Sequence, residues 1–216
     1  MANIYIALVD TPGLFADLIR KVIKQNYIHT VLSLDPDFEE AYSFGRRNPS
    51  IPLLSGFEKE DKHKVLKAFP GAKYMIYTVQ CTEEQKAYIQ DILERTMPYR
   101  YHYHYATIGL PYILFKKAYH QKYHYTCSSY LARLLDEAGV IHFGKHFSLV
   151  TPRDFLEYGQ DAVWFEGKLA QFIEEMPGRK LSGRSSITVL DQAASGDNII
   201  PVKTSCQDSL LQENAS

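Results

Sequence analysis

Residues 125–140 read YTCSSYLARLLDEAGV, and we take this stretch as the one around which the chain is organised. Its apolar residues after the first turn are Leu131, Leu134, Leu135 and Ala138. A spacing of three and four predicts a helix with one buried stripe. Thr126 is a suitable N-cap and Gly139 a natural end. The stretch therefore predicts a helix that packs on a core.

Cys127 falls in the first turn of this expected helix. Backbone N–H groups there, together with the positive end of the helix dipole, favour a thiolate and can hold a developing oxyanion. A cysteine nucleophile suits this place. Cys127 also lies four residues before Leu131, however, and could extend the buried stripe as a small apolar side chain. The choice between the two depends on whether a histidine base lies nearby.

Length and composition indicate one globular domain with a tail. The chain has 216 residues, and all 28 aromatic residues lie at or before Phe172. We expect the folded domain at residues 1–175 and a flexible tail at residues 176–216, where Ser, Gly, Asn and Asp are frequent. The net charge of -1 gives no electrostatic reason to expect a nucleic-acid partner.

The cysteines and the hydrophobic runs indicate a cytoplasmic protein. Cys81, Cys127 and Cys206 are odd in number and widely spaced, which does not indicate a disulfide framework. The first ten residues lack the basic segment of a signal peptide. No apolar run reaches the length of a membrane span, so we expect no integral membrane segment.

The remaining pattern predicts an α+β fold, with an antiparallel sheet packed against helices. The expected strands are residues 4–9, 28–34, 39–44, 73–80 and 162–166. The expected helices follow N-caps at Thr11, Thr82, Thr126 and Thr151, with a short polar helix at 59–69. Asp35-Pro36-Asp37 predicts a turn that joins residues 28–34 and 39–44 into a hairpin, and Pro49, Pro52 and Gly56 indicate an irregular loop.

His29 on the second expected strand is the candidate base for Cys127. A thiolate–imidazolium pair is the minimal machinery for acyl transfer through a thioester, and a third polar group must fix the histidine tautomer. On the returning strand of the hairpin, Ser43 is the first choice for that group, with Tyr42 and Glu40 as alternatives.

The order of the two residues separates the candidate folds. Chymotrypsin-like cysteine proteases also place histidine first, but their nucleophile lies in a glycine-rich loop, whereas Cys127 begins an amphipathic helix. Four segments carry a resemblance to another group: residues 27–33 (YIHTVLS), 42–46 (YSFGR), 125–131 (YTCSSYL) and 148–155 (SLVTPRDF). With them the chain resembles the circularly permuted branch of the NlpC-type papain-fold superfamily, the YiiX-like proteins, which includes the lecithin:retinol acyltransferase-like enzymes. The resemblance covers roughly the first 170 residues.

This resemblance implies a permuted papain-like α+β fold and a cysteine hydrolase that needs no cofactor. Cys127 would be the nucleophile, His29 the base, and the third polar residue would fall at or near Ser43. The implied substrate is a peptide or a small acyl-bearing molecule, cleaved at an amide bond of peptide or cell-wall-peptide type. Two alternatives stay open. One is a lipid or thioester acyltransferase on the same pair, with peripheral membrane contact. The other is an inactive binding module that uses a tyrosine-rich face.

Residues 99–125 hold eight tyrosines and four histidines. If residues 101–105 were extended, His102 and His104 would share one face, but no acidic or cysteine ligand accompanies them, so we expect no metal site. Tyrosines offer amphipathic contact area, and the candidate substrate-binding residues are Tyr42, Tyr105 and Tyr125.

Overall fold

A computed structural model describes residues 1–12, 16–17, 20–21, 25–47, 55–106, 112–113 and 115–175. In these ranges it holds a six-stranded antiparallel sheet of order β4-β3-β2-β1-β5-β8. The strands are β1 (Ala2–Asp10), β2 (His29–Ser33), β3 (Ala41–Arg46), β4 (Ser55–Glu60), β5 (Lys73–Cys81) and β8 (Val163–Lys168). Two short parallel strands, β6 (His104–Tyr105) and β7 (His124–Tyr125), form a second sheet. The expected α+β class is confirmed.

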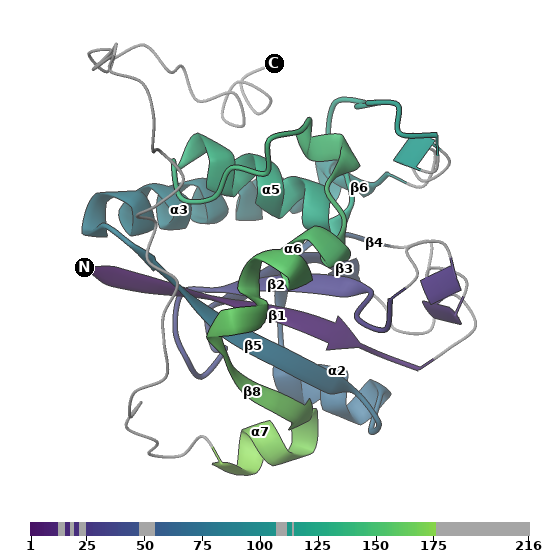
Figure 1. The fold of residues 1–216 in the computed structure, drawn as a ribbon, viewed down its shortest axis with the longest axis vertical. Coiled ribbons are helices and arrows are strands. Elements are labelled where there is room, and N and C mark those ends of the chain that lie inside the picture. The colour runs from purple at the N-terminus through teal and green to yellow at the C-terminus, as the bar shows by residue number, and fades with distance from the viewer. Residues whose placement is uncertain are drawn as a thin grey trace.

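Helices cover both faces of the large sheet (Figure 1). The described part of the chain has the five α-helices α2 (Lys62–Ala68), α3 (Glu83–Thr96), α5 (Cys127–Glu137), α6 (Pro152–Gly159) and α7 (Leu169–Glu175). The first face packs against α3, α5 and α6, and the second against α2 and α7. Buried residues of β1 alternate between these two cores, with Ile4, Ile6 and Leu8 on one side and Tyr5, Ala7 and Val9 on the other. A strand covered on both faces is apolar throughout rather than at every second residue.

Helix α5 forms as its sequence predicts. The Thr126 side chain accepts a hydrogen bond from the Ser129 N–H, and the Ser129 side chain accepts one from the Thr126 N–H. Together these two bonds form a capping box. Leu131, Leu134 and Leu135 are fully buried, and the helix packs over β2 and β3. Gly139 follows its end at a φ of 65°, a left-handed conformation that glycine adopts without a steric penalty. This packing brings the first turn of α5 toward β2.

Most of the expected strands are confirmed. Residues 4–9, 28–34, 39–44, 73–80 and 162–166 correspond to β1, β2, β3, β5 and β8. The β2–β3 hairpin is antiparallel, with Leu32 opposite Tyr42, and β8 lies at an edge of the sheet. The expected tail with Cys206, and most of the helix expected after Thr11, lie outside the described residues.

Two local predictions are wrong. Gly56 lies in strand β4, not in a loop, and the helix expected at 59–69 begins only at Lys62, with Asp61 as its N-cap. Glu58, Lys59 and Glu60 favour helices locally, but pairing with β3 overrides that preference. Residues 101–105 are not extended throughout: a 3-10 helix spans Met97–His102, and only His104–Tyr105 is a strand.

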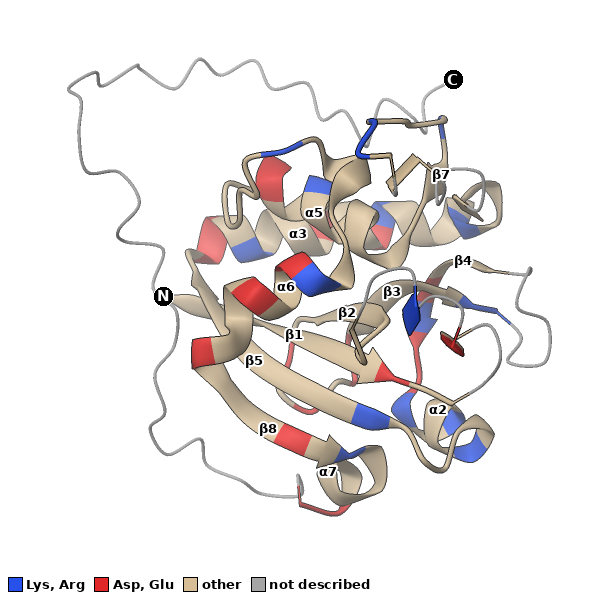
Figure 2. Ribbon diagram, turned by 45° about the vertical axis from the view of Figure 1, so that its right-hand side comes forward, with Lys and Arg blue, Asp and Glu red and all other residues tan. Residues whose placement is uncertain are grey.

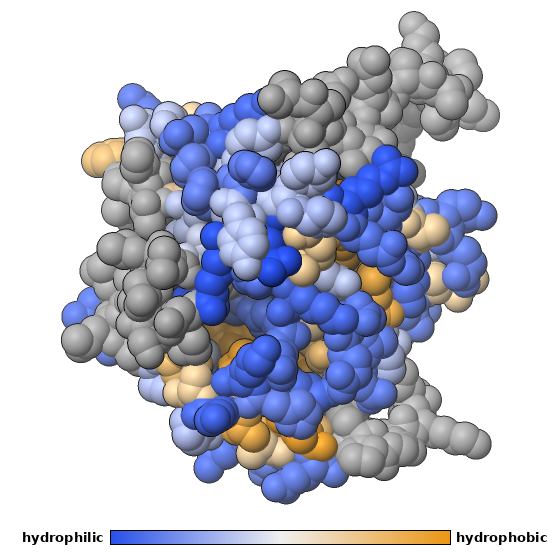
Figure 3. Space-filling model, turned by 180° about the vertical axis from the view of Figure 1, so that it is seen from behind, coloured by the Kyte–Doolittle hydropathy of each residue, from blue (hydrophilic) through white to orange (hydrophobic). Residues whose placement is uncertain are grey.

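Acidic and basic residues are both distributed over many helices and strands of the described chain (Figure 2). On the side opposite to the view of Figure 1, the described residues are mainly hydrophilic, and hydrophobic residues form small patches among them (Figure 3). Among the residues that the structure describes, no helix combines the length and the apolar character that crossing a membrane requires.

Candidate functional site

The site is built where a strand and a helix both begin. His29 is the first residue of β2, and Cys127 is the first residue of α5. Their side chains are hydrogen-bonded to each other, although they are 98 positions apart in the sequence. The two residues that the sequence pairs as base and nucleophile are therefore in contact.

Glu60 holds the other side of the imidazole. Its Oε1 lies 2.6 Å from His29 Nε2, and it is the last residue of β4. Because Nε2 faces the carboxylate, Nδ1 is the ring nitrogen left for the Cys127 thiol. The imidazole thus bridges the thiol and the carboxylate. This arrangement fixes its tautomer in the way that nucleophilic catalysis requires.

Gly45 makes room for this bridge. Strand β3 lies between β2 and β4, so the His29–Glu60 contact passes over it. A Cβ placed on Gly45 would lie 3.0 Å from Glu60 Oε1, 3.1 Å from Ser43 Oγ and 3.8 Å from His29 Cε1. The first two separations are tighter than ordinary van der Waals contact. The absence of a side chain at Gly45 is what lets Glu60 reach the imidazole.

Ser43 contacts Glu60, whereas we expected it to contact His29. Its Oγ donates a 2.6 Å hydrogen bond to Glu60 Oε1, and the side chain is fully buried. We expected Ser43 to orient His29 directly, with Tyr42 and Glu40 as alternatives. In the structure Glu60 takes that position and Ser43 supports it, while Tyr42 donates to Glu40 at 2.8 Å.

The electrostatics favour a charged imidazole. Burial works against the charge on His29, but the negative charge of Glu60 and the hydrogen bonds to Cys127 and Glu60 outweigh it and raise the pKa of His29 from 6.5 to about 10. Burial likewise opposes ionisation of Glu60, yet His29 and the bond from Ser43 hold its pKa below the usual value. The His29 and Glu60 side chains are only 20% and 13% exposed, so solvent screens the pair weakly.

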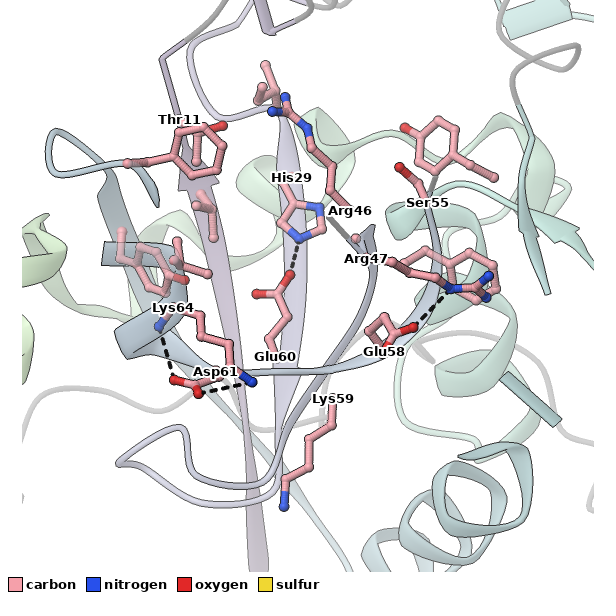
Figure 4. Close-up of a pocket in the computed structure, with 18 residues that line it drawn as sticks. Thr11, His29, Arg46, Arg47, Ser55, Glu58, Lys59, Glu60, Asp61 and Lys64 are labelled. Carbon is pink, nitrogen blue, oxygen red and sulfur yellow. Dashed lines mark hydrogen bonds and ion pairs between the residues drawn. The ribbon is translucent and has the colours of Figure 1, made fainter. Parts of the chain in front are cut away.

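A cavity of about 250 Å³ adjoins this group (Figure 4). His29 and Glu60 face it, and so do the apolar side chains Val9, Ile28, Phe44, Val65 and Phe69. Arg46 and Tyr105 also line the cavity. Cys127 is 2% exposed and is not among the described residues that line the cavity.

The three predicted substrate-binding tyrosines are placed differently. Tyr105 lines the cavity, and its pKa is raised by burial and by the charge of Cys127, with Arg46 acting in the opposite direction. Tyr42 stacks on Phe57 with ring centroids 6.1 Å apart, within the core. Tyr125 is also fully buried, in the same core. The structure brings only Tyr105 of the three to the cavity.

The histidine-rich stretch does not build a metal centre in the described residues. His104 and His124 lie side by side with ring centroids 5.3 Å apart on β6 and β7. No group of three or more histidine, cysteine or acidic side chains suited to a metal ion occurs within the described ranges.

Glu60 is the residue that sequence reasoning missed. The helix-favouring run Glu58-Lys59-Glu60 concealed the strand, so Glu60 was assigned to the beginning of a helix. One signal was present: Asp61, an N-cap residue followed by a short polar helix, places the end of the preceding strand at Glu60.

Comparisons of the chain with protein-family models, with curated proteins and with solved structures found no match.

Proposed function

We propose that the protein is a cysteine hydrolase of permuted papain-like fold that cleaves an amide bond through a thioester. The observation that carries this proposal is the connected series Cys127, His29 and Glu60 at the start of a buried helix. A nucleophile, a base and a group that orients the base are the minimum for this chemistry. The order in the chain, with the histidine strand before the cysteine helix, is the order of the permuted family that the sequence resembles.

The reaction begins with the ion pair. The Cys127 thiolate attacks the carbonyl carbon, an S–C bond forms, and the carbonyl π electrons move to oxygen. The His29 imidazolium gives its proton to the leaving nitrogen as the C–N bond breaks, so the amine departs and a thioester remains. Water then attacks the thioester and gives a proton to His29. The C–S bond breaks, and the acid is released with the thiolate restored.

The start of α5 supplies the oxyanion site in this proposal. The Thr126 side chain already accepts the Ser129 N–H, so the oxyanion takes the N–H groups of Cys127 and Ser128. Negative charge is further favoured there by the positive end of the helix dipole. The same local geometry therefore stabilises both the thiolate and the intermediate that it forms.

Trapping the acyl-enzyme tests the proposal. With p-nitrophenyl acetate, an active thiol gives a burst of nitrophenolate and an acetyl group on Cys127, which peptide mapping by mass spectrometry locates. Cys127→Ala should give no burst, and Cys81→Ala should give the wild-type burst. Acetyl groups found only on lysines or on Cys81 would contradict the proposal.

One observation favours a second candidate, the non-catalytic binding module. Cys127 is 2% exposed and belongs to the main core, as a structural cysteine would. In that case the thiol reacts with no electrophile until the protein unfolds, and the burst is absent in the wild type. The same experiment thus separates the two functions.

The acyltransferase alternative uses the same thioester and differs only in what accepts the acyl group. At about 250 Å³ the cavity lies below the roughly 300–1,000 Å³ of pockets for drug-sized ligands. It has room for one side chain or a short acyl group and not for a long lipid chain. The cavity therefore favours hydrolysis of a small amide.

A further inference from the structure

One segment of the chain carries no acidic residue. Between Arg95 and Leu135 the sequence has six lysines and arginines and four histidines but no Asp or Glu, although the chain as a whole has a net charge of -1. Nine of the 16 tyrosines also lie there. A local excess of positive charge is an electrostatic reason to expect an anionic partner at this segment, even where the overall charge gives none.

Exposed aromatic side chains gather in the same segment. Among the described residues five large hydrophobic side chains are exposed, and four of them are Tyr99, Tyr101, Tyr112 and Phe115. Phe115 is the most exposed of these four, at 75%. A single exposed apolar residue is ordinary, but several in one stretch mark an interaction surface. The segment therefore combines positive charge with apolar contact area.

A tight turn holds Phe115 next to two lysines. The Lys116 N–H donates to the Ile113 carbonyl at 3.1 Å, and the Lys117 N–H donates to the Tyr112 carbonyl at 3.0 Å. Lys116 has a φ of 53°, in the left-handed region that residues other than glycine seldom adopt. Phe115, Lys116 and Lys117 are all exposed. The turn thus presents an apolar ring and two ammonium groups together.

The turn is tied to the side of the molecule where α5 begins. The Tyr112 ring stacks on the Tyr119 ring with centroids 4.6 Å apart, and the Tyr119 N–H donates to Ser148 Oγ at 3.2 Å. The chain then enters β7 and α5, whose first residue is Cys127. Figure 1 shows this part of the chain at an outer edge of the molecule, and in Figure 2 the stretch that leads into β7 carries basic residues in blue and no acidic ones.

The aromatic rings of this segment are poorly suited to nucleic acid. Single-stranded nucleic acid stacks its bases on aromatic ring faces. The Tyr101 ring is already in cation–π contact with Arg47 and Arg100, whose guanidinium carbons lie 5.1 and 4.5 Å from its centroid. The Tyr112 ring is stacked on Tyr119. Contacts within the protein therefore occupy faces that bases would need.

A lipid surface suits the turn better than an acidic peptide does. An acidic peptide pairs with the two lysines but leaves the Phe115 ring in water. Anionic headgroups and acyl chains satisfy both kinds of side chain at once, because lysines bind the headgroups while an apolar ring enters the boundary below them. Tyrosine is also a usual residue at this depth. The chemistry of the turn thus matches an anionic bilayer.

We propose that the turn carrying Phe115, Lys116 and Lys117 docks the protein on an anionic lipid surface. Phe115 inserts at the boundary between headgroups and acyl chains, and the two lysines bind the headgroups. This contact needs no lipid chain in the cavity beside His29, so it is compatible with a small amide substrate. The inference goes beyond the proposed hydrolase and does not depend on it.

Co-sedimentation of the whole chain with vesicles tests the lysines. Wild type should bind phosphatidylcholine vesicles that contain about 30% phosphatidylserine, should not bind phosphatidylcholine alone, and should be released by high salt. Lys116→Gln with Lys117→Gln should lower the binding constant by about 10- to 30-fold, because each lysine near an anionic surface contributes about fivefold. Lys67→Gln with Lys73→Gln, two exposed lysines of α2 and β5, is the matched control and should change it less than about twofold. Equal losses in both double variants would overturn the proposal.

The ring is tested in the same assay. Phe115→Ser should lower binding by about 10-fold, and Phe115→Trp should restore it, because tryptophan also enters the interface. Cys127→Ala should bind as wild type does, so the result is independent of catalysis. No binding to the phosphatidylserine vesicles would overturn the inference. So would binding that is unchanged in Phe115→Ser and is matched by polyglutamate or by oligothymidylate, because the surface would then recognise polyanions and not a bilayer.

Discussion

Two cysteines lie at two strand-to-helix junctions, and they differ in what surrounds them. Cys81 ends β5 just before the capping box of α3, and Cys127 follows the capping box residue that begins α5. Both are buried, at 4% and 2% exposure. Burial raises the pKa of the Cys81 thiol. Cys127 instead has His29 as a hydrogen-bond partner, with Glu60 behind it.

The comparison shows that burial near a helix start is common to both cysteines, so it cannot by itself distinguish the proposed nucleophile. Both thiols are removed from water, and both neighbouring helices are well capped. Only Cys127 lies inside the first turn, where N–H groups face an anion. Of the two cysteines, only Cys127 is hydrogen-bonded to a histidine, His29, whose positive charge is stabilised by Glu60. The base and the group that orients it make the difference.

The largest expected effect is the difference in activity between the two cysteine-to-alanine variants. Cys127→Ala should lower kcat for amide hydrolysis by about 10⁴-fold or more, because the covalent route is lost. Cys81→Ala should leave kcat within about twofold and lower the free energy of unfolding by about 1 kcal/mol. Steady-state kinetics and urea denaturation measure the two quantities. Equal losses of activity in both variants would remove the distinction.

Glu60→Gln should have the next largest effect. The amide keeps the shape of the side chain but removes its charge, so we expect kcat to fall by about 10²- to 10⁴-fold. Loss of the carboxylate also lowers the pKa of His29 from about 10, so the alkaline limb of kcat/KM should move to lower pH. Glu58→Gln, on the same strand, is the matched control. An unmoved limb would show that Glu60 does not hold the imidazolium.

Gly45→Ala should displace the Glu60 carboxylate that holds His29. The added Cβ would meet Glu60 Oε1 at 3.0 Å and Ser43 Oγ at 3.1 Å, so the carboxylate must shift by a few tenths of an ångström. We expect kcat to fall by about 10-fold with a smaller change in KM, because the base is misplaced. Gly71→Ala, where a Cβ meets no atom within 4 Å, should leave kcat unchanged. If both alanines behave alike, the space over β3 is irrelevant to the base.

Ser43→Ala should have the smallest effect on activity. It removes one hydrogen bond to Glu60 but leaves the His29–Glu60 contact in place. The loss of kcat should be about 2- to 10-fold, which is the value of one such bond. Should this variant instead lose as much activity as Glu60→Gln, Ser43 would be the orienting group after all.

The sequence allowed helix α5, the pairing of Cys127 with His29 and most of the sheet to be predicted. Helix α5 has its cap, its stripe and its glycine end within 16 residues, from 125 to 140. The apolar runs of β1, β2 and β5 are long enough to be assigned without knowledge of their partners.

Glu60 could not be predicted in the same way, because its place depends on the pairing of β4 with β3. The local preference of Glu58-Lys59-Glu60 for a helix points the other way. The position of Arg46 beside Phe69 depends on how α2 packs under the sheet. Contacts between distant segments decide both, and no short pattern in the sequence records them.

In the proposed mechanism, His29 makes Cys127, and not Cys81, a reactive thiol. Iodoacetamide labelling of the folded protein across pH, followed by mass spectrometry at each cysteine in wild type and in His29→Ala, tests it most directly. We predict rapid labelling of Cys127 near neutral pH, a shift of this labelling to higher pH in His29→Ala, and slow labelling of Cys81 in both. Labelling of Cys127 only after denaturation, as for a core residue, would show that His29 does not activate this thiol.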